Sequence, residues 1–134
     1  MRWLFKTEPS QYSFADLQQD RITVWEGVSN PAALINLRKC LPGEDVFIYH
    51  TGSERRIVGL ARITAGPRPD PKLNDARRVV VDVKAADSLL RPVTLQEMKA
   101  SRALADFDLL RLGRLSIVPV HDKHWREIIR LAGT

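Results

Sequence analysis

The chain has 134 residues, of which 44% are hydrophobic, and this is the size and apolar content of one globular domain that folds without disulfides or metal. Its single cysteine excludes an internal disulfide, and the sequence shows neither a signal-like leader nor an apolar run of membrane-spanning length. We therefore expect one domain over residues 1–134, in the cytoplasm and without a membrane partner. The 21 Lys and Arg residues outnumber the 16 Asp and Glu residues, and the net charge of +5 favours a polyanionic partner such as nucleic acid.

The first fifty residues predict three strands and two helices. The strands are expected over Arg2–Thr7, Ile22–Trp25 and Asp45–His50, which are rich in β-branched and aromatic residues. Ser13 followed by Asp16 is a capping box that predicts a short helix. Asn30 is a favourable N-cap residue and Pro31 fits the first helical position, so a second helix is expected over residues 32–40.

The rest of the chain predicts a central hairpin followed by short elements. Residues 51–54 have turn chemistry, so residues 57–63 are expected to pair antiparallel with the strand before them. Residues 66–71 include three prolines and predict a surface loop before a strand at 78–83. The remaining predicted elements are a helix opened by a capping box at Thr94 and Glu97, a short helix over 101–110, a strand over 114–120 and a terminal helix capped by Asp122.

These elements predict an α+β domain. Five or six short strands with single short helices between them, and no regular strand–helix–strand alternation, indicate a curled, mostly antiparallel sheet or small β-barrel. No glycine-rich phosphate loop follows any of the predicted strands, so a nucleotide cofactor of the Rossmann or Walker type is not expected.

The stretch from Trp25 to Pro31 joins a strand end, a bend and a helix start. Gly27 permits the bend, and the helix that begins after Asn30 would point its free N–H groups back toward Trp25. An indole face beside unpaired backbone donors suits a flat ligand with polar edges, such as a nucleobase. The alternative is that Trp25 is a core tryptophan in a strand.

Strand alternation allows only one of Tyr49 and His50 to face such a pocket. We assign His50, because an imidazole at a strand end is easier to satisfy beside a polar ligand than in the core. Its alternative role is a structural hydrogen bond that ties the strand to a loop.

Catalytic and metal sites have weaker support in the sequence. Cys40, Asp45 and His50 could be drawn as a nucleophilic set, but a cysteine on an apolar helix end before a proline is typical of a buried structural thiol. The histidines and Glu8 do not have the spacing of metal ligands. We therefore predict no catalytic residue, no metal and no cofactor.

Basic residues are concentrated between residues 54 and 78, a segment that contains seven Lys and Arg residues but only three Asp and Glu residues. We expect Arg55, Arg56, Arg77 and Arg78 to contact the phosphates of a nucleic acid. The alternative is a solvated loop without a partner.

Several motifs, taken in chain order, resemble the EVE domain family. They are W-L-F-K-T-E-P at residues 3–9, W-E-G-V with Asn30 at 25–30, G-E-D-V-F-I-Y-H at 43–50, V-G at 58–59, and L-S-I with P-V at 115–120. Their number and order make the resemblance specific over essentially the whole chain. Ser29 and Leu34 stand where the family usually has arginine, so contacts of those arginines are not carried over.

The resemblance implies a PUA-like fold related to the YTH domain, which reads methylated adenine in an aromatic cage, and places Trp25 where that domain keeps a cage tryptophan. We predict a non-enzymatic reader of a modified nucleobase, a modified cytosine or another methylated base, in DNA or RNA, acting as a monomer or weak dimer. The alternatives are a small-molecule or nucleotide sensor that uses the same pocket and a base-processing hydrolase. The predicted ligand-binding residues are Lys6, Thr7, Trp25, Gly27, Val28, Asn30, His50 and Ser116.

Overall fold

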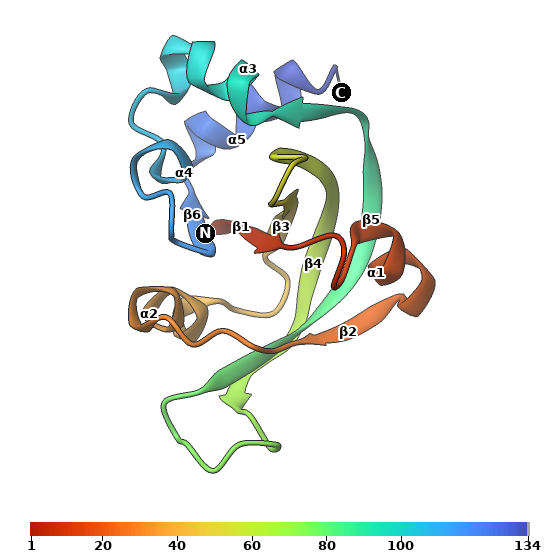
Figure 1. The fold of residues 1–134 in the computed structure, drawn as a ribbon, viewed down its shortest axis with the longest axis vertical. Coiled ribbons are helices and arrows are strands. Elements are labelled where there is room, and N and C mark those ends of the chain that lie inside the picture. The colour runs from red at the N-terminus through yellow and green to blue at the C-terminus, as the bar shows by residue number, and fades with distance from the viewer. Residues whose placement is uncertain (134) are drawn as a thin grey trace.

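The computed structural model describes residues 1–133 and contains a six-stranded mixed sheet with short helices around it (Figure 1). The strand order is β2 (Ile22–Trp25), β5 (Val79–Thr94), β4 (Arg56–Pro69), β3 (Asp45–His50), β1 (Arg2–Thr7) and β6 (Ile117–Val120). β1 and β3 are parallel, and all other neighbours are antiparallel. The outer strands β2 and β6 do not pair within these residues. The predicted α+β fold is therefore confirmed, with a curled sheet that stays open instead of closing into a barrel.

The helices begin where local capping signals predict them. Their bounds are α1 (Phe14–Asp20), α2 (Pro31–Lys39), α3 (Leu95–Ala100), the 3₁₀ helix η1 (Arg102–Leu104), α4 (Asp108–Arg111) and α5 (Asp122–Leu131). Capping boxes at Ser13 and Thr94 open α1 and α3. At α2 the Asn30 side chain accepts hydrogen bonds from the first backbone N–H groups, and Pro31 occupies the first turn.

The predicted loop over residues 66–71 is wrong for its first part, because β4 continues to Pro69. β3 pairs only with residues 56–62 of β4, so the far part of β4 has a neighbour on one side alone. A proline there sacrifices no ladder hydrogen bond on the open side, which is why the prolines do not end the strand. The loop between β4 and β5 spans residues 70–78.

The single helix predicted over residues 101–110 is also wrong, because the segment divides into η1 and α4. Leu104, Phe107 and Leu109 are all buried. At 100° per residue, one continuous helix would send Leu109 to a different face from the other two. Breaking the helix allows all three side chains to enter the core.

Two further corrections concern the C-terminal elements. β6 is limited to Ile117–Val120, because residues 112–116 form a turn that leads into it. The N-cap of α5 is His121, without a side-chain hydrogen bond, and Asp122 is the first helical residue. The Asp122 carboxylate accepts a hydrogen bond from Arg2, which ties α5 to the start of β1.

The core lies between the curled sheet and the helices around it. Phe14 of α1 packs directly on Gly59 of β4, where a Cβ atom would lie 2.2 Å from the phenyl ring. On another part of the sheet, Phe47 stacks on Trp125 of α5 with ring centroids 3.8 Å apart. These contacts fix α1 and α5 against the strands that carry the candidate site.

Candidate nucleic-acid interface

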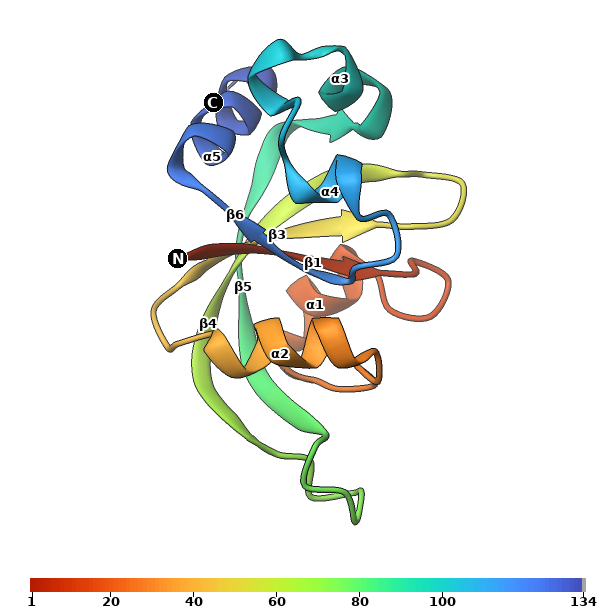
Figure 2. The ribbon, with the colours of Figure 1, turned by 90° about the vertical axis from the view of Figure 1, so that its left-hand side faces the viewer.

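Several segments that are distant in sequence meet at one edge of the molecule (Figure 2, right-hand side). The ends of β1 and β3 lie side by side, with Thr7 paired to His50. The turn before β6 joins them, because the Lys6 backbone N–H donates to the Ser116 carbonyl (3.0 Å) and Lys6 Nζ donates to the Gly113 carbonyl (2.9 Å). The structure therefore brings four predicted ligand-binding residues together, although their roles stay predictions.

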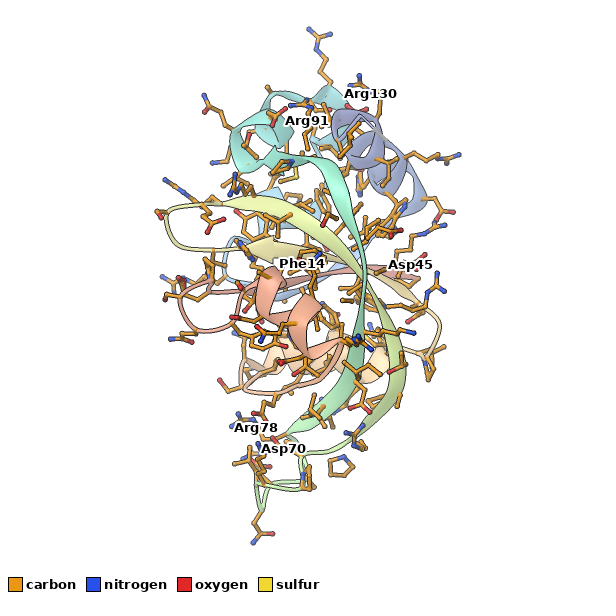
Figure 3. All side chains as sticks on the ribbon, turned by 90° about the vertical axis from the view of Figure 1, so that its right-hand side faces the viewer. Phe14, Asp45, Asp70, Arg78, Arg91 and Arg130 are labelled. Carbon is orange, nitrogen blue, oxygen red and sulfur yellow. The ribbon has the colours of Figure 1, made fainter. Side chains whose placement is uncertain are left out.

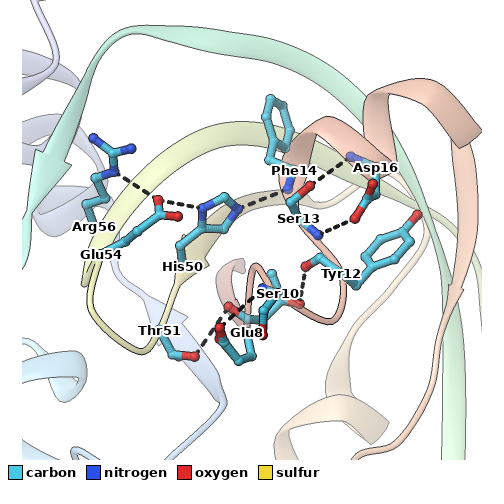
Figure 4. A network of polar contacts seen from close by, with 11 residues as sticks. Glu8, Ser10, Tyr12, Ser13, Phe14, Asp16, His50, Thr51, Glu54 and Arg56 are labelled. Atoms are coloured by element: carbon cyan, nitrogen blue, oxygen red, sulfur yellow. Dashed lines mark hydrogen bonds and ion pairs between the residues drawn. The ribbon is translucent and has the colours of Figure 1, made fainter.

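His50 is buried and both of its ring nitrogens have protein partners (Figure 4). Nε2 accepts a hydrogen bond from the Phe14 backbone N–H (3.0 Å), and Nδ1 lies 2.9 Å from a carboxylate oxygen of Glu54. Because a backbone amide can only donate, the proton of the neutral ring must be on Nδ1. Glu54 also accepts from Arg56, and these contacts hold the pKa of Glu54 below its usual value.

Tyr49, on the opposite side of β3, lines a hollow of about 210 Å³ at the same edge. We name it the Lys6 hollow. It is lined by Lys6, Tyr49, Thr51, Gly52, Arg55, Leu95, Leu109 and Gly113. Tyr49 is the one of the two that reaches this hollow, and the role of His50 at a pocket beside Trp25 stays a prediction.

Trp25 is only 7% exposed. Its indole packs against Phe5 with ring centroids 5.4 Å apart, and Tyr12 meets it edge-on at 6.4 Å. A base that stacks on Trp25 would have to reach an indole that is almost completely covered. The stacking role of Trp25 stays a prediction.

The turn between β2 and α2 is held by the β4–β5 loop. Gly27 has a φ of +84° and supplies the bend, and Val28 is buried with its carbonyl accepting a hydrogen bond from Arg78 Nε (2.9 Å). Lys72 of the same loop forms an ion pair with Glu26 (3.2 Å). A loop that could cover a pocket is thus already attached to the predicted ligand-binding turn.

An apolar groove of about 550 Å³ lies between α2 and the turn before β6. Asn30 and Asn36 are among its lining residues, and so are the exposed apolar residues Ile35 and Leu112. Asn36 donates to the Ile117 carbonyl (2.8 Å) and so joins α2 to β6. The sequence pattern did not indicate this groove, because its walls come from segments about 80 residues apart.

Three arginines surround a separate hollow of about 510 Å³ beside α2. We call Arg38, Arg77 and Arg78 the arginine cluster. Arg38 donates to the Arg77 carbonyl, and the Arg77 guanidinium makes two hydrogen bonds of 3.1 Å to Asp75. These bonds hold the pKa of Asp75 below its usual value. Figure 3 places Arg78 at the end of the molecule that the β4–β5 loop forms.

The four arginines predicted to contact phosphates therefore occupy three different surroundings. Arg55 lines the Lys6 hollow, Arg56 is paired with Glu54, and Arg77 and Arg78 belong to the arginine cluster. Arg38 was missed, because its position on a helix does not indicate that it meets a loop 40 residues away.

The residues considered for catalysis do not assemble. Cys40 is buried, its thiol lies 3.6 Å from the Asn36 carbonyl, and burial raises the pKa of the thiol. Within residues 1–133, no group of three or more His, Cys, Asp or Glu side chains could hold a metal ion. In the same range no helix has the length and apolar character to cross a bilayer.

Comparison with known proteins gives consistent results. A model of the EVE domain matches residues 1–131. Human thymocyte nuclear protein 1 is 29% identical over an alignment that covers 96% of this chain and 72% of the relative. The NMR structure of Rpa0253 from Rhodopseudomonas palustris is 35% identical, with a TM-score of 0.93 and coverage of 98% and 92% of the two chains.

A crystal structure of human THYN1 protein in complex with 5-methylcytosine-containing DNA also matches. It is 28% identical, with a TM-score of 0.91, and the match covers 99% of this chain and 98% of that one. With a family model over nearly all of its length, the chain belongs to the EVE domain family.

Proposed function

We propose that this protein is a non-enzymatic reader of a modified nucleobase in nucleic acid, with a methylated cytosine in DNA as the first candidate. The observation that carries the proposal is its structural match, over nearly the whole chain, to THYN1 in complex with 5-methylcytosine-containing DNA. The net charge of +5 and the two groups of cations on the surface are consistent with a phosphate backbone as the larger part of the partner.

The energetics favour a base that is easy to remove from a duplex. Flipping a base out costs a few kcal/mol, and stacking on one aromatic ring returns only about 1–3 kcal/mol. The rest must come from phosphate contacts and from the modification. A modified base in a single strand or opposite a mismatch is therefore the preferred target.

The arrangement gives no support to a base-processing hydrolase. The Cys40 thiol is buried with a raised pKa, and a nucleophile needs the thiolate. The Nε2 lone pair of His50 already accepts from a backbone amide, so it is not available as a general base. Incubation with the bound oligonucleotide should therefore leave the base unchanged.

Binding to matched oligonucleotides tests the proposal. Fluorescent strands that differ only in one 5-methylcytosine are titrated at fixed salt as a single strand, a mismatched duplex and a matched duplex. We expect tighter binding of the modified strand, strongest in the single strand or mismatch. Equal affinity for modified and unmodified strands would contradict the reader, and full competition by the free modified nucleoside would favour the small-molecule sensor.

Two replacements of Trp25 separate stacking from core packing. Trp25→Phe keeps an aromatic face, whereas Trp25→Leu keeps apolar volume without one. If the indole stacks on the base, Leu should weaken binding of the modified strand by about 1–3 kcal/mol and Phe by less. Both variants must melt cooperatively, because the buried indole also supports the core. Equal binding by the two variants would leave Trp25 as a core residue.

A further inference from the structure

The charged residues that line the Lys6 hollow all have the same sign. Among residues 1–133, its two charged lining residues, Lys6 and Arg55, are both cations, and none of the described residues contributes a carboxylate to its walls. At about 210 Å³ it is smaller than the roughly 300–1,000 Å³ of sites that enclose whole small molecules. Its size and charge suit a single anionic group.

Lys6 is desolvated without a counter-ion. Within residues 1–133 the lysines that form ion pairs are Lys72 and Lys123, so the Lys6 ammonium has no carboxylate partner. It contacts the Gly113 carbonyl and the face of the Tyr49 ring, 5.9 Å from the ring centroid. Burial lowers the pKa of Lys6, which means that the fold disfavours this charge. A bound anion would compensate for the unfavourable burial.

Arg55 adds an independent observation. Its φ is +46°, in the left-handed region that residues other than glycine rarely adopt. Such strain is concentrated at binding sites, where the surrounding structure holds a side chain in place. Burial raises the pKa of the Tyr49 phenol, and the charge of the nearby Arg55 opposes this rise. Two cations, one near the end of β1 and one in the turn between β3 and β4, thus lie close to Tyr49.

The acids of the neighbouring turns, Glu54 and Glu8, have other contacts. Glu54 binds His50 and Arg56. Glu8 packs against Gly52, where one carboxylate oxygen accepts from the Ser10 N–H, and its other oxygen has no partner within the described residues. Neither acid forms an ion pair with Lys6 or Arg55, so an incoming anion displaces no protein carboxylate.

We propose that the Lys6 hollow binds a phosphate group of a nucleic-acid strand, through Lys6 and Arg55 and with Tyr49 as a further donor. The proposal deepens the proposed function and relies on it for the identity of the strand. The charge and size of the hollow are independent of which base is read. The phosphate is either a phosphodiester within the strand or a terminal phosphomonoester.

The test uses variants that remove one donor at a time. Lys6→Met keeps the apolar stem, Arg55→Asn suits a positive φ, and Tyr49→Phe removes only the hydroxyl. Arg21→Asn is a matched control, since Arg21 also has a positive φ (70°) and carries one charge, but lines none of the described hollows. Binding of an unmodified, fluorescent single-stranded oligonucleotide is measured over a salt series, and melting temperatures confirm folding.

One phosphate contact adds a slope of about −0.7 to −0.9 to log K against log salt, which corresponds to about four- to sixfold in affinity at 0.15 M salt. We therefore expect Lys6→Met and Arg55→Asn each to weaken binding by about this factor. The salt slope should fall by roughly one unit in each, whereas Arg21→Asn leaves it unchanged. Tyr49→Phe should weaken binding without changing the slope. If Lys6→Met and Arg55→Asn match the Arg21→Asn control, the hollow is not a phosphate site.

Two further comparisons identify the source of the phosphate and separate the two proposals. If Lys6→Met weakens the binding of strands with and without a 5′-phosphate equally, the bound phosphate is internal. If it weakens the binding only of strands with a 5′-phosphate, the bound phosphate is terminal. The ratio of affinities for modified and unmodified strands tests the reader separately. If the wild-type protein binds both strands equally, the proposed function is contradicted. A smaller salt slope in Lys6→Met would still support phosphate binding in the hollow.

Discussion

The Lys6 hollow and the arginine cluster differ in how their positive charges are balanced. In the hollow, Lys6 is half-buried and forms an ion pair with no carboxylate of the described part of the chain. In the cluster, Arg77 is exposed and already paired with Asp75 through two hydrogen bonds. A phosphate entering the hollow meets a charge without a partner, whereas at the cluster it must compete with a resident carboxylate. A count of basic residues does not distinguish these two situations.

The two regions also connect to different parts of the candidate interface. Lys6 reaches the turn before β6 through the Gly113 carbonyl. Arg78 holds the Val28 carbonyl, and so joins the cluster to the turn between β2 and α2. The arginine cluster is thus attached to the predicted ligand-binding turn. The cations of the Lys6 hollow form a second group, near the ends of β1 and β3.

The largest expected effect comes from combining the two regions. If one strand contacts both, Lys6→Met and Arg78→Gln act on separate phosphates and their losses multiply. At about four- to sixfold each, the double variant should bind an unmodified single strand roughly 16- to 36-fold more weakly, with a salt slope reduced by about two units. A double variant no weaker than the worse single variant would mean that the regions do not bind the same strand. Fluorescence anisotropy over a salt series gives both quantities.

A smaller effect distinguishes two members of the cluster. Arg78→Gln removes a charge and the tie to Val28, whereas Arg38→Gln removes a charge and its contact with the Arg77 carbonyl. Both should weaken binding of any strand by about four- to sixfold. Only Arg78→Gln should also lower the affinity ratio of modified to unmodified strands, because it releases the predicted ligand-binding turn. An unchanged ratio in Arg78→Gln would separate the cluster from base recognition.

Removing the resident carboxylate should improve binding. Asp75→Asn frees the Arg77 guanidinium for phosphate, so we expect affinity for an unmodified strand to rise about two- to fivefold at low salt, where exposed charges are least screened. Asp87→Asn, the same change of charge at an exposed position on β5, is the control for net charge. Equal gains in the two variants would show only a net-charge effect. The Lys6 hollow offers no equivalent substitution, because its walls contain no acid.

Local signals predicted the starts of α1, α2 and α3 well, because each depends on contacts within a few residues. The capping boxes and the Asn30–Pro31 pair determine these starts without reference to the rest of the fold. The pairing of Arg77 with Asp75, two residues apart, could also have been recognised from the sequence.

Sequence patterns were a poorer guide where contacts between residues distant in sequence determine the structure. β4 passes through its prolines because β3 begins opposite Arg62 and leaves the rest of β4 without a neighbour on that side. Nor did these patterns indicate that His50 accepts a hydrogen bond from the Phe14 N–H, 36 residues away, or that Tyr49 lines a hollow. Strand alternation separates two neighbouring side chains onto opposite faces, but it does not say which face receives a ligand.

Acid pH provides a weaker measure of the same contrast. Hydrogen bonds from Arg77 hold the pKa of Asp75 below the ordinary value near 3.8. A depressed pKa stabilises the folded state above the ordinary pKa, and this contribution is lost as the pH falls through the lowered value. Wild type should therefore melt slightly above Asp75→Asn at pH 6, with the difference closing below pH 3.8. A constant difference at all pH values would mean that the Asp75 charge contributes nothing.

Alkaline pH should show the opposite sign for Lys6. Burial lowers the pKa of Lys6 from its ordinary value of 10.5, so between the two values the unfolded chain binds more protons than the folded one. The destabilising effect of the buried charge is present at neutral pH and disappears as the pH rises toward 10.5. Wild type should thus gain stability relative to Lys6→Met over this range, because Met carries no proton. Melting curves of the two proteins in parallel cancel the titration of the tyrosines, and a difference that does not vary with pH would mean that the Lys6 charge is fully solvated.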